Sequence, residues 1–312
     1  MPVTATKLGR SAARIAALGA LAVVAALGTS RASEAQTLDR VRGAAAIRLG
    51  YEANARPFSF GDGGAPTGYA VALCKMVADR VKADLGLPDL AASWVPVQGD
   101  DRFRGVRDGS VDLLCSAPAV TLSSRKEVSF SLPIFPSGTG AVLSASSPVA
   151  LREVLTQGQP SGRPIWRGSP ARVVLEQQTF SPVAGTVSEG WVAERIKALE
   201  LAATVVPAKT YEDGIQRILD GGSRVLFGDM PLLRDAVAHS PASGNLIILD
   251  RYFTHQSLAL ALPRADEDFR LEVDRALSGI YGTDGFRNLL AEWFGIPDEK
   301  ILTFFRQTAL PE

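Results

Sequence analysis

Carboxylates, hydroxyls and arginines are plentiful in this chain, but the motifs of hydrolytic and metal-dependent centres are missing. The sequence contains no GxSxG, HExxH, CxxC or GxxxxGK[ST] segment. A catalytic nucleophile needs a neighbouring base, and the two histidines, His239 and His255, stand isolated in the sequence. We expect surface or hinge positions for both. Two Cys and two His exclude a four-cysteine zinc site, and we expect no metal and no cofactor.

Two segments repeat one pattern and place polar residues at comparable points. Residues 103–116 and 215–229 each read as a helix, an Asp-Gly pair or Asp-Gly-Gly turn, an apolar strand, and then small or acidic residues. In open α/β sheets, ligands bind beyond the carboxyl ends of the strands. Residues 116–121 and Asp229 are therefore candidates to face a common ligand from two lobes of similar design.

The elements that must position these residues alternate between strand and helix. For example, apolar residues at Val71, Cys74, Val77 and Val81 follow helical spacing. The expected strands are 45–51, 93–97, 111–116, 203–207, 224–228, 246–250 and 257–262, and the expected helices are 69–85, 101–108, 189–199, 211–220, 266–281 and 283–294. This alternation favours an α/β fold with largely parallel strand pairing. We expect a bend between lobes at 138–140 and a loose tail at 310–312.

Length, hydrophobic content and charge limit the number of domains and the classes of partner that the chain could bind. A chain of 312 residues is long enough for two domains, and 46% hydrophobic residues supply an ample core. The 33 basic and 33 acidic residues balance, without a basic block. We expect no nucleic-acid partner, because phosphate binding needs a concentrated positive surface.

The first 35 residues have the three-part pattern of a secretory signal peptide. Basic residues precede an apolar run at 15–27, and small residues flank Glu34 at the expected cleavage site. The alternative is an uncleaved anchor, but the run is shorter than the ~20 residues that span a bilayer. No other stretch could span a membrane. We expect a cleaved signal peptide at 1–35 and a mature chain with a net charge of about −3.

Export changes the interpretation of the two cysteines. In an oxidising compartment, Cys74 and Cys115 are expected to form a disulfide. Two buried free thiols are the alternative.

Several segments in order resemble the periplasmic amino-acid-binding proteins of ABC transporters, the bacterial extracellular solute-binding family 3. They are IRLGYEANARPFSF, GYAVALCKMVADRV, DRFRGVRDGSVDLLC, VSFSLPIF, GTVSEGW and FGDMPLL. The resemblance runs from about residue 45 to 295. It implies a bilobal type II periplasmic-binding-protein fold, with two α/β lobes joined by a two-strand hinge that closes on the ligand. Lobe 1 would comprise 36–136 plus 257–312 and lobe 2 residues 137–256. One branch of the family has a disulfide like the Cys74–Cys115 pair.

The resemblance also implies roles for individual residues. An amino acid needs a carboxylate for its ammonium group and an arginine with hydroxyl or backbone donors for its carboxylate. Asp229 matches the ammonium-binding acid, with helix N-capping as the alternative. Phe103 matches an aromatic wall, with core packing as the alternative. Further candidates are Thr186, at a helix start that could donate to the carboxylate, Ser116 after the first-lobe strand, and Glu52 in the first matched segment.

The segment that resembles the family's T-x-T-x-x-R departs from it. Ala119 replaces the first hydroxyl, Thr121 is retained, and Ser124 stands at the arginine position. Arg125 follows one residue later, which on a helix means about 100° of rotation. Val187 and Ala55 replace a further threonine and an aromatic residue of the family pattern.

These departures leave the source of the ligand-binding positive charge open. Arg125, Arg56 or Arg102 could supply it, or the ligand is not a standard α-amino acid. If Arg125 is the substitute, Arg125→Ala should weaken binding by about tenfold or more. The alternative is that Arg125 is a solvated surface charge.

The resemblance implies a monomeric periplasmic receptor that passes a polar amino acid or related molecule to an ABC permease, without chemistry of its own. Two alternatives remain. One is an enzyme on the same fold, similar to cyclohexadienyl dehydratases. The other is a sensor that presents its ligand state to a membrane receptor. The sequence does not separate transport from sensing, and it does not identify the ligand.

Overall fold

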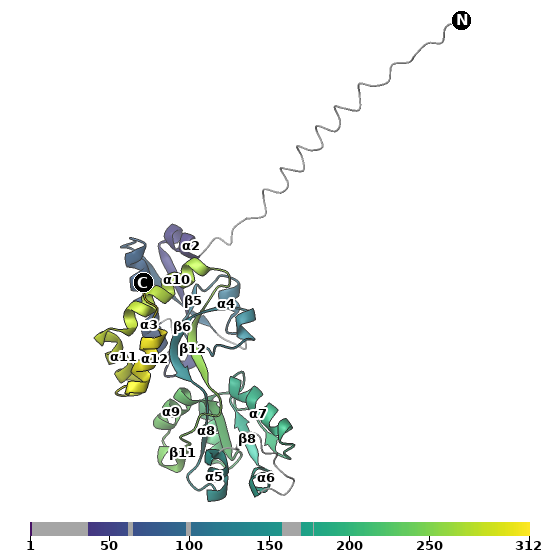
Figure 1. Cartoon of the computed structure of the whole chain (residues 1–312). Coiled ribbons are helices and arrows are strands. Elements are labelled where there is room, and N and C mark those ends of the chain that lie inside the picture. The colour runs from purple at the N-terminus through teal and green to yellow at the C-terminus, as the bar shows by residue number, and fades with distance from the viewer. Residues whose placement is uncertain (2–36, 62–64, 98–100, 158–169, 177) are drawn as a thin grey trace.

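Two five-stranded sheets, each flanked by helices, form two lobes (Figure 1). The computed structural model describes residues 1, 37–61, 65–97, 101–157, 170–176 and 178–312. The signal peptide expected at 1–35 lies, apart from Met1, outside the described residues and stays a prediction. Among the helices that are described, none is long and apolar enough to cross a bilayer.

The first lobe holds the N-terminal part of the described chain together with the C-terminus. Its sheet has the order β4-β1-β5-β12-β6, with β1 Ala46–Glu52, β4 Ala91–Val97, β5 Leu113–Leu114, β6 Ser129–Ser137 and β12 Gln256–Leu262. A small hairpin joins β2 (Asn54–Ala55) to β3 (Ser59–Phe60). The helices are α2 Thr37–Ala44, α3 Tyr69–Asp84, α4 Arg104–Arg107, η1 Ser124–Lys126, α10 Glu267–Tyr281, α11 Asp284–Phe294 and α12 Glu299–Thr308.

The second lobe is built from the middle of the chain (Figure 1). Its sheet has the order β11-β7-β10-β8-β9, with β7 Thr139–Ser144, β8 Thr179–Pro182, β9 Thr204–Val205, β10 Val225–Asp229 and β11 Leu246–Ile248. The helices are α5 Val149–Gln157, α6 Pro170–Leu175, α7 Val187–Ala198, α8 Tyr211–Leu219, α9 Met230–His239 and η2 Ser243–Asn245.

The bilobal α/β fold predicted from the sequence is confirmed, but the prediction of largely parallel pairing was wrong in part. β1 pairs in parallel with β4 and β5, and β8 with β9 and β10. β12 runs antiparallel to β5 and β6, and β7 antiparallel to β10 and β11. The reason is topological. β7 enters the second-lobe sheet from the first lobe and β12 enters the first-lobe sheet from the second lobe, so each runs opposite to its neighbours. The lobe boundaries at 136/137 and 256/257 stay a prediction.

The two lobes are connected where β6 continues into β7 and where the chain returns into β12. Gly138 separates β6 from β7, and a Cβ atom on it would lie 2.0 Å from the carbonyl oxygen of Thr254. Glycine is needed here because the two crossing segments approach each other too closely for a side chain. The backbone N–H of Thr139 donates to Thr254 Oγ1 at 2.9 Å, which ties the segments together.

A disulfide fixes the first lobe's main helix to its sheet. Cys74 in α3 and Cys115, directly after β5, are bonded, with their Cα atoms 6.1 Å apart and both side chains buried. The predicted bridge is confirmed, and the alternative of two free thiols was wrong. The bridge holds in place the strand end from which residues 116–121 depart.

Candidate functional site

Asp229 lies where the second-lobe sheet meets the crossing strands. It ends β10 and is the N-cap of α9, whose second residue is Pro231. Its side chain makes no capping hydrogen bond, although its position is that of a cap. The carboxylate is buried and points to other partners. The N-cap interpretation therefore holds for the backbone alone, and the ammonium-binding role of the side chain stays a prediction.

Two uncharged groups hold this carboxylate. Gln256 Nε2 donates to Asp229 Oδ1, and the Tyr211 hydroxyl donates to Oδ2 at 3.3 Å while accepting from the Asp229 N–H at 3.2 Å. Burial raises the pKa of Asp229, and these hydrogen bonds together with the positive charge of Arg102 oppose the rise. Hydrogen bonds from neutral donors do not cancel the negative charge, and Asp229 has no ion-pair partner among the described residues. A buried carboxylate of this kind is suited to receive a cation.

Arg102 extends from the first lobe toward this region. Its Nη2 atom lies 3.8 Å from the position that a Cβ atom would take on Gly185, directly before α7 of the second lobe. Its charge also lowers the pKa of both Asp229 and Tyr211, although burial keeps the Tyr211 pKa well above its usual value. Arg102 is half-buried and makes no hydrogen bond or ion pair with any residue that the structure describes. It is an uncommitted cation between the lobes.

The start of α7 adds a second element that favours an anion. Thr186 is the N-cap, but its hydroxyl donates to the Val183 carbonyl oxygen at 2.7 Å and lies 2.6 Å from Ser188 Oγ. The N–H of Gly185 is bound by Glu189 Oε2 at 2.9 Å. The Thr186 side chain is thus already engaged. What α7 offers a ligand is the positive end of its dipole and the N–H groups of its first turn.

Two buried serines, Ser116 after β5 and Ser137 at the end of β6, carry hydroxyl groups in the first lobe. Ser116 Oγ and Ser137 Oγ are buried without a hydrogen bond of good geometry, and Ser137 lies near enough to lower the pKa of Asp229. Beyond Ser116 the chain runs antiparallel to β12, with the Val120 N–H donating to the Ser257 carbonyl oxygen at 2.9 Å. Both serines are on segments that approach Gln256.

Two other candidates are engaged in packing or local turns. Phe103 is half-buried and packs edge-to-face on Phe130, with ring centroids 6.1 Å apart, so the core-packing alternative is supported. Thr121 Oγ1 accepts from the N–H of Ser124 at 3.0 Å, and Ser124 Oγ accepts from the N–H of Thr121 at 3.0 Å. The serine at the family's arginine position therefore closes its own turn.

Of the three remaining charged candidates, Arg125 points to solvent and Arg56 is already paired. Arg125 on η1 is exposed, and its side chain makes no hydrogen bond or ion pair within the described part of the chain. Arg56 donates to Asp235 Oδ2 on α9 at 3.3 Å, with its Nη2 3.2 Å from His239 Nε2 and its guanidinium stacked on Phe60. It thereby forms a contact between the lobes.

Glu52 is the third of these candidates. It ends β1, half-buried, and exchanges backbone hydrogen bonds with the Ser59 hydroxyl. The structure brings Arg102 of the first lobe near Asp229 and near Gly185, which precedes Thr186. Within the described residues, neither the Ser116 nor the Glu52 side chain makes a hydrogen bond to this set.

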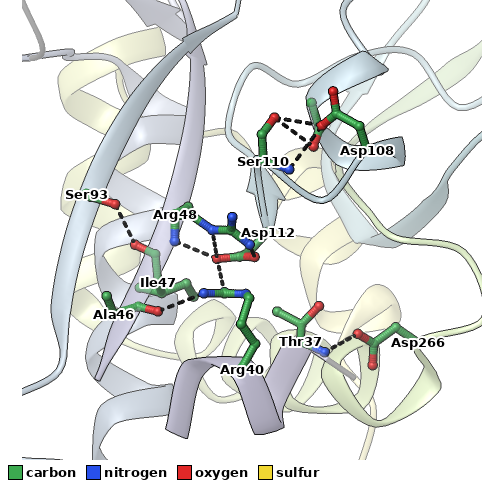
Figure 2. Close-up of polar contacts among 11 residues, drawn as sticks. Thr37, Arg40, Ala46, Ile47, Arg48, Ser93, Asp108, Ser110, Asp112 and Asp266 are labelled. Carbon is green, nitrogen blue, oxygen red and sulfur yellow. Dashed lines mark hydrogen bonds and ion pairs between the residues drawn. The ribbon is translucent and has the colours of Figure 1, made fainter. Parts of the chain in front are cut away.

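Two further first-lobe arginines lie at the opposite end of the sheet. Figure 2 shows Arg40 from α2 and Arg48 from β1 converging on Asp112, which precedes β5. Arg48 contacts this buried carboxylate through its backbone N–H at 2.7 Å and Nη2 at 2.8 Å. Ser116 follows the same strand, so these pairs are separated from the candidate site by the length of β5. They stabilise the N-terminal part of the lobe.

Three residues of the site were not predicted from the sequence: Tyr211, Gln256 and Ser137. Tyr211 begins an expected helix and Gln256 directly precedes an expected strand, positions without a sequence signal of function. The crossing of the lobes brings them to Asp229. Within the described ranges, no group of three or more Cys, His, Asp or Glu residues could hold a metal ion.

With this geometry established, comparison with known proteins defines the family. The profile of the bacterial extracellular solute-binding proteins, family 3, matches residues 47–296. The chain belongs to this family. It is thus a solute-binding protein, as the resemblance in its sequence predicted.

Relatives and solved structures agree with this assignment. An L-glutamate/L-aspartate-binding protein of Pseudomonas aeruginosa is 23% identical over 263 residues, covering 84% of this chain and 80% of the relative. An L-cystine-binding protein of Escherichia coli is 22% identical over 292 residues, covering 92% and 96%. A putative ABC transporter binding component of Wolinella succinogenes, complexed with lysine, superposes with a TM-score of 0.64 at 21% identity, covering 83% of this chain and 99% of that one.

An ancestral amino-acid-binding protein described as a precursor of cyclohexadienyl dehydratase also has this fold. It superposes with a TM-score of 0.65 at 20% identity and covers 83% of this chain and all of its own. At such identities, both structural similarities establish the bilobal fold and leave the ligand open.

Proposed function

We propose that this solute-binding protein holds a polar α-amino acid in its zwitterionic form between the two lobes. The observation that supports this most strongly is a pair of opposite charges, Asp229 in one lobe and Arg102 in the other, neither of which has an ion-pair partner among the described residues. An ammonium group would bind Asp229. A carboxylate would bind between Arg102 and the start of α7, where a guanidinium and a helix N-terminus act together.

The ligands named for relatives and neighbours fit this proposal. Glutamate, aspartate, cystine and lysine all share the α-ammonium and α-carboxylate groups, while their side chains differ. In our proposal the shared groups bind the two charges, and the side chain contacts the region of Phe103 and Ser116. Arg102 takes the role that Ser124 cannot fill.

We also propose that the protein acts in the periplasm as a monomer and delivers its ligand to an ABC permease. The signal-peptide pattern at 1–35 and the disulfide support an exported protein. We further propose that binding is not followed by turnover, since Asp229 is held to bind a charge rather than to transfer a proton. Incubation with prephenate and arogenate tests this point, and conversion of either compound would favour the dehydratase alternative.

Titration calorimetry with L-glutamate, L-aspartate, L-cystine, L-lysine and L-arginine tests the binding proposal. The mature protein (36–312), refolded free of carried-over ligand, should bind at least one of them. The same titration with Asp229→Asn should show loss of that binding. Binding that survives this substitution would contradict the role of Asp229.

A further inference from the structure

A chain of hydrogen bonds connects Asp229 to both strands that cross between the lobes. Gln256 is the first residue of β12, and its Nε2 donates to Asp229 Oδ1. The other end of the same amide, Oε1, lies 2.9 Å from the Thr254 hydroxyl. Thr254 Oγ1 in turn accepts from the N–H of Thr139, the first residue of β7, at 2.9 Å.

The chemistry of these groups fixes the orientation of the Gln256 amide. An ionised carboxylate accepts hydrogen bonds and donates none, so the amide must present its NH₂ end to Asp229. Its carbonyl end then faces Thr254, whose hydroxyl carries one proton and lies 2.9 Å from both Gln256 Oε1 and Thr139 Oγ1. A rotated amide would place two acceptors together at Asp229 and lose that contact.

We propose that Gln256 is a positioning residue that holds the Asp229 carboxylate at the crossing and couples its charge to the hinge strands. This rests on the proposed function, in which Asp229 receives the ammonium group of the ligand. Because Gln256 is neutral, it fixes the carboxylate without neutralising it. The same residue lies on a strand whose rotation would open or close the lobes.

The other groups that face Asp229 come from separate elements. Tyr211 on α8 donates to Oδ2, Arg102 of the first lobe contributes its charge, and Ser137 of β6 lies close by. Burial raises the pKa of Asp229, and among the opposing influences the hydrogen bond from Gln256 is the largest. Loss of the Gln256 amide should therefore let Asp229 take up a proton at a higher pH.

The test uses ligand-free protein and reads the titration of Asp229 from the ¹³C shift of its side-chain carboxyl carbon. Gln256→Leu should move the midpoint of this titration upward. Gln216→Leu is the matched control, because Gln216 Nε2 donates to Asp220 Oδ1 at 2.9 Å on the exposed face of α8. The control should leave the Asp229 midpoint unchanged.

An unchanged Asp229 midpoint in Gln256→Leu would overturn the proposal, since a purely structural role in the hinge would not shift this titration. If Gln256→Leu does not fold, Thr254→Val replaces it. That variant keeps Gln256 but removes the hydroxyl that orients its amide, and it should shift the midpoint in the same direction by less. Failure of the proposed function is seen separately, as amino-acid binding that persists in Asp229→Asn.

Discussion

The guanidinium group of Arg102, which belongs to the first lobe, lies beside Gly185 at the start of α7 in the second lobe. This places a positive charge next to a helix N-terminus, a combination that repels cations and favours a carboxylate. In the family pattern that the sequence resembles, an arginine at the position of Ser124 would bind the carboxylate. Here Ser124 bonds to Thr121 and Arg125 is exposed, and our proposal gives this role to Arg102.

Arg102→Gln should weaken amino-acid binding by about thirtyfold or more, on the order of 2 kcal/mol, because a charged donor to an enclosed carboxylate is lost. Arg125→Ala is the matched control and should leave the affinity within about twofold, as expected for a surface charge. Titration calorimetry on both variants measures the difference. A loss in Arg125→Ala with none in Arg102→Gln would assign the role to Arg125, one of the three arginines that the sequence left open.

Asp229→Asn should abolish binding while making the ligand-free protein more stable at neutral pH. Because burial raises the folded-state pKa of Asp229, this carboxyl group favours the folded state when protonated, and that contribution is lost as the pH rises through the raised pKa. Asparagine stays neutral throughout, so it avoids the cost. Thermal unfolding at pH 7 should show a higher midpoint for the variant. A lower midpoint would mean that the charge is already compensated in the free protein.

The same pKa shift sets the pH dependence of binding. The ammonium group requires an ionised Asp229, so affinity should fall as the pH drops through its pKa. The fall should begin at a higher pH than an ordinary aspartate would give. Titration calorimetry over a pH series measures this fall in affinity. An affinity that stays constant down to the usual pKa range of aspartate would refute the prediction.

Removing the disulfide should destabilise the first lobe. The bridge between Cys74 and Cys115 spans 41 residues, and closing such a loop contributes about 3 to 4 kcal/mol on the chain-entropy model. The double variant Cys74→Ala, Cys115→Ala should lower the free energy of unfolding in urea by this order. Wild-type protein unfolded under reducing conditions is the control and should lose a similar amount. A loss below about 1 kcal/mol would indicate that packing around α3 is sufficient.

Gly138→Ala should disturb the crossing between the lobes. The added methyl group would meet the Thr254 carbonyl oxygen at 2.0 Å, which forces the two crossing segments apart. We expect a destabilisation of about 1 to 3 kcal/mol, typical of overpacking. Gly244→Ala is the control, because nothing lies within 4 Å of the added group. Equal unfolding midpoints for the two variants would contradict the close approach.

Much of the fold could be predicted because local patterns determine it. The helix α3 follows from apolar residues at helical spacing. Gly109, the glycine of the Asp-Gly pair in the first repeated segment, follows the end of α4 with a positive φ of 73°. The helix α12 was missed, although Asp298 precedes it and caps it through the N–H of Ile301 at 2.9 Å. Asp298 was therefore the sequence signal for the start of this helix. The last helix expected from the sequence ended at residue 294, before α12 begins.

The candidate site was less predictable, because its parts meet only in three dimensions. Asp229 could be named as a candidate since it directly follows a strand, where ligands bind in α/β folds. Gln256 and Tyr211 donate hydrogen bonds to the same carboxylate, but neither residue directly follows a strand, so the sequence pattern did not point to them. The choice among Arg56, Arg102 and Arg125 likewise depended on which arginine was already paired: Arg56 is bound to Asp235.

The most direct test of the central claim, that opposite charges in the two lobes hold a zwitterion, is a thermal-unfolding scan of the refolded mature protein. The scan covers the twenty amino acids and L-cystine, each compared with its des-amino and decarboxylated analogues where these exist. At about 100 times its Kd, a bound amino acid should stabilise the fold by ~2.7 kcal/mol, and its single-charge analogues should give much smaller shifts. A keto acid or an amine that stabilises the protein while every α-amino acid is silent would contradict the claim.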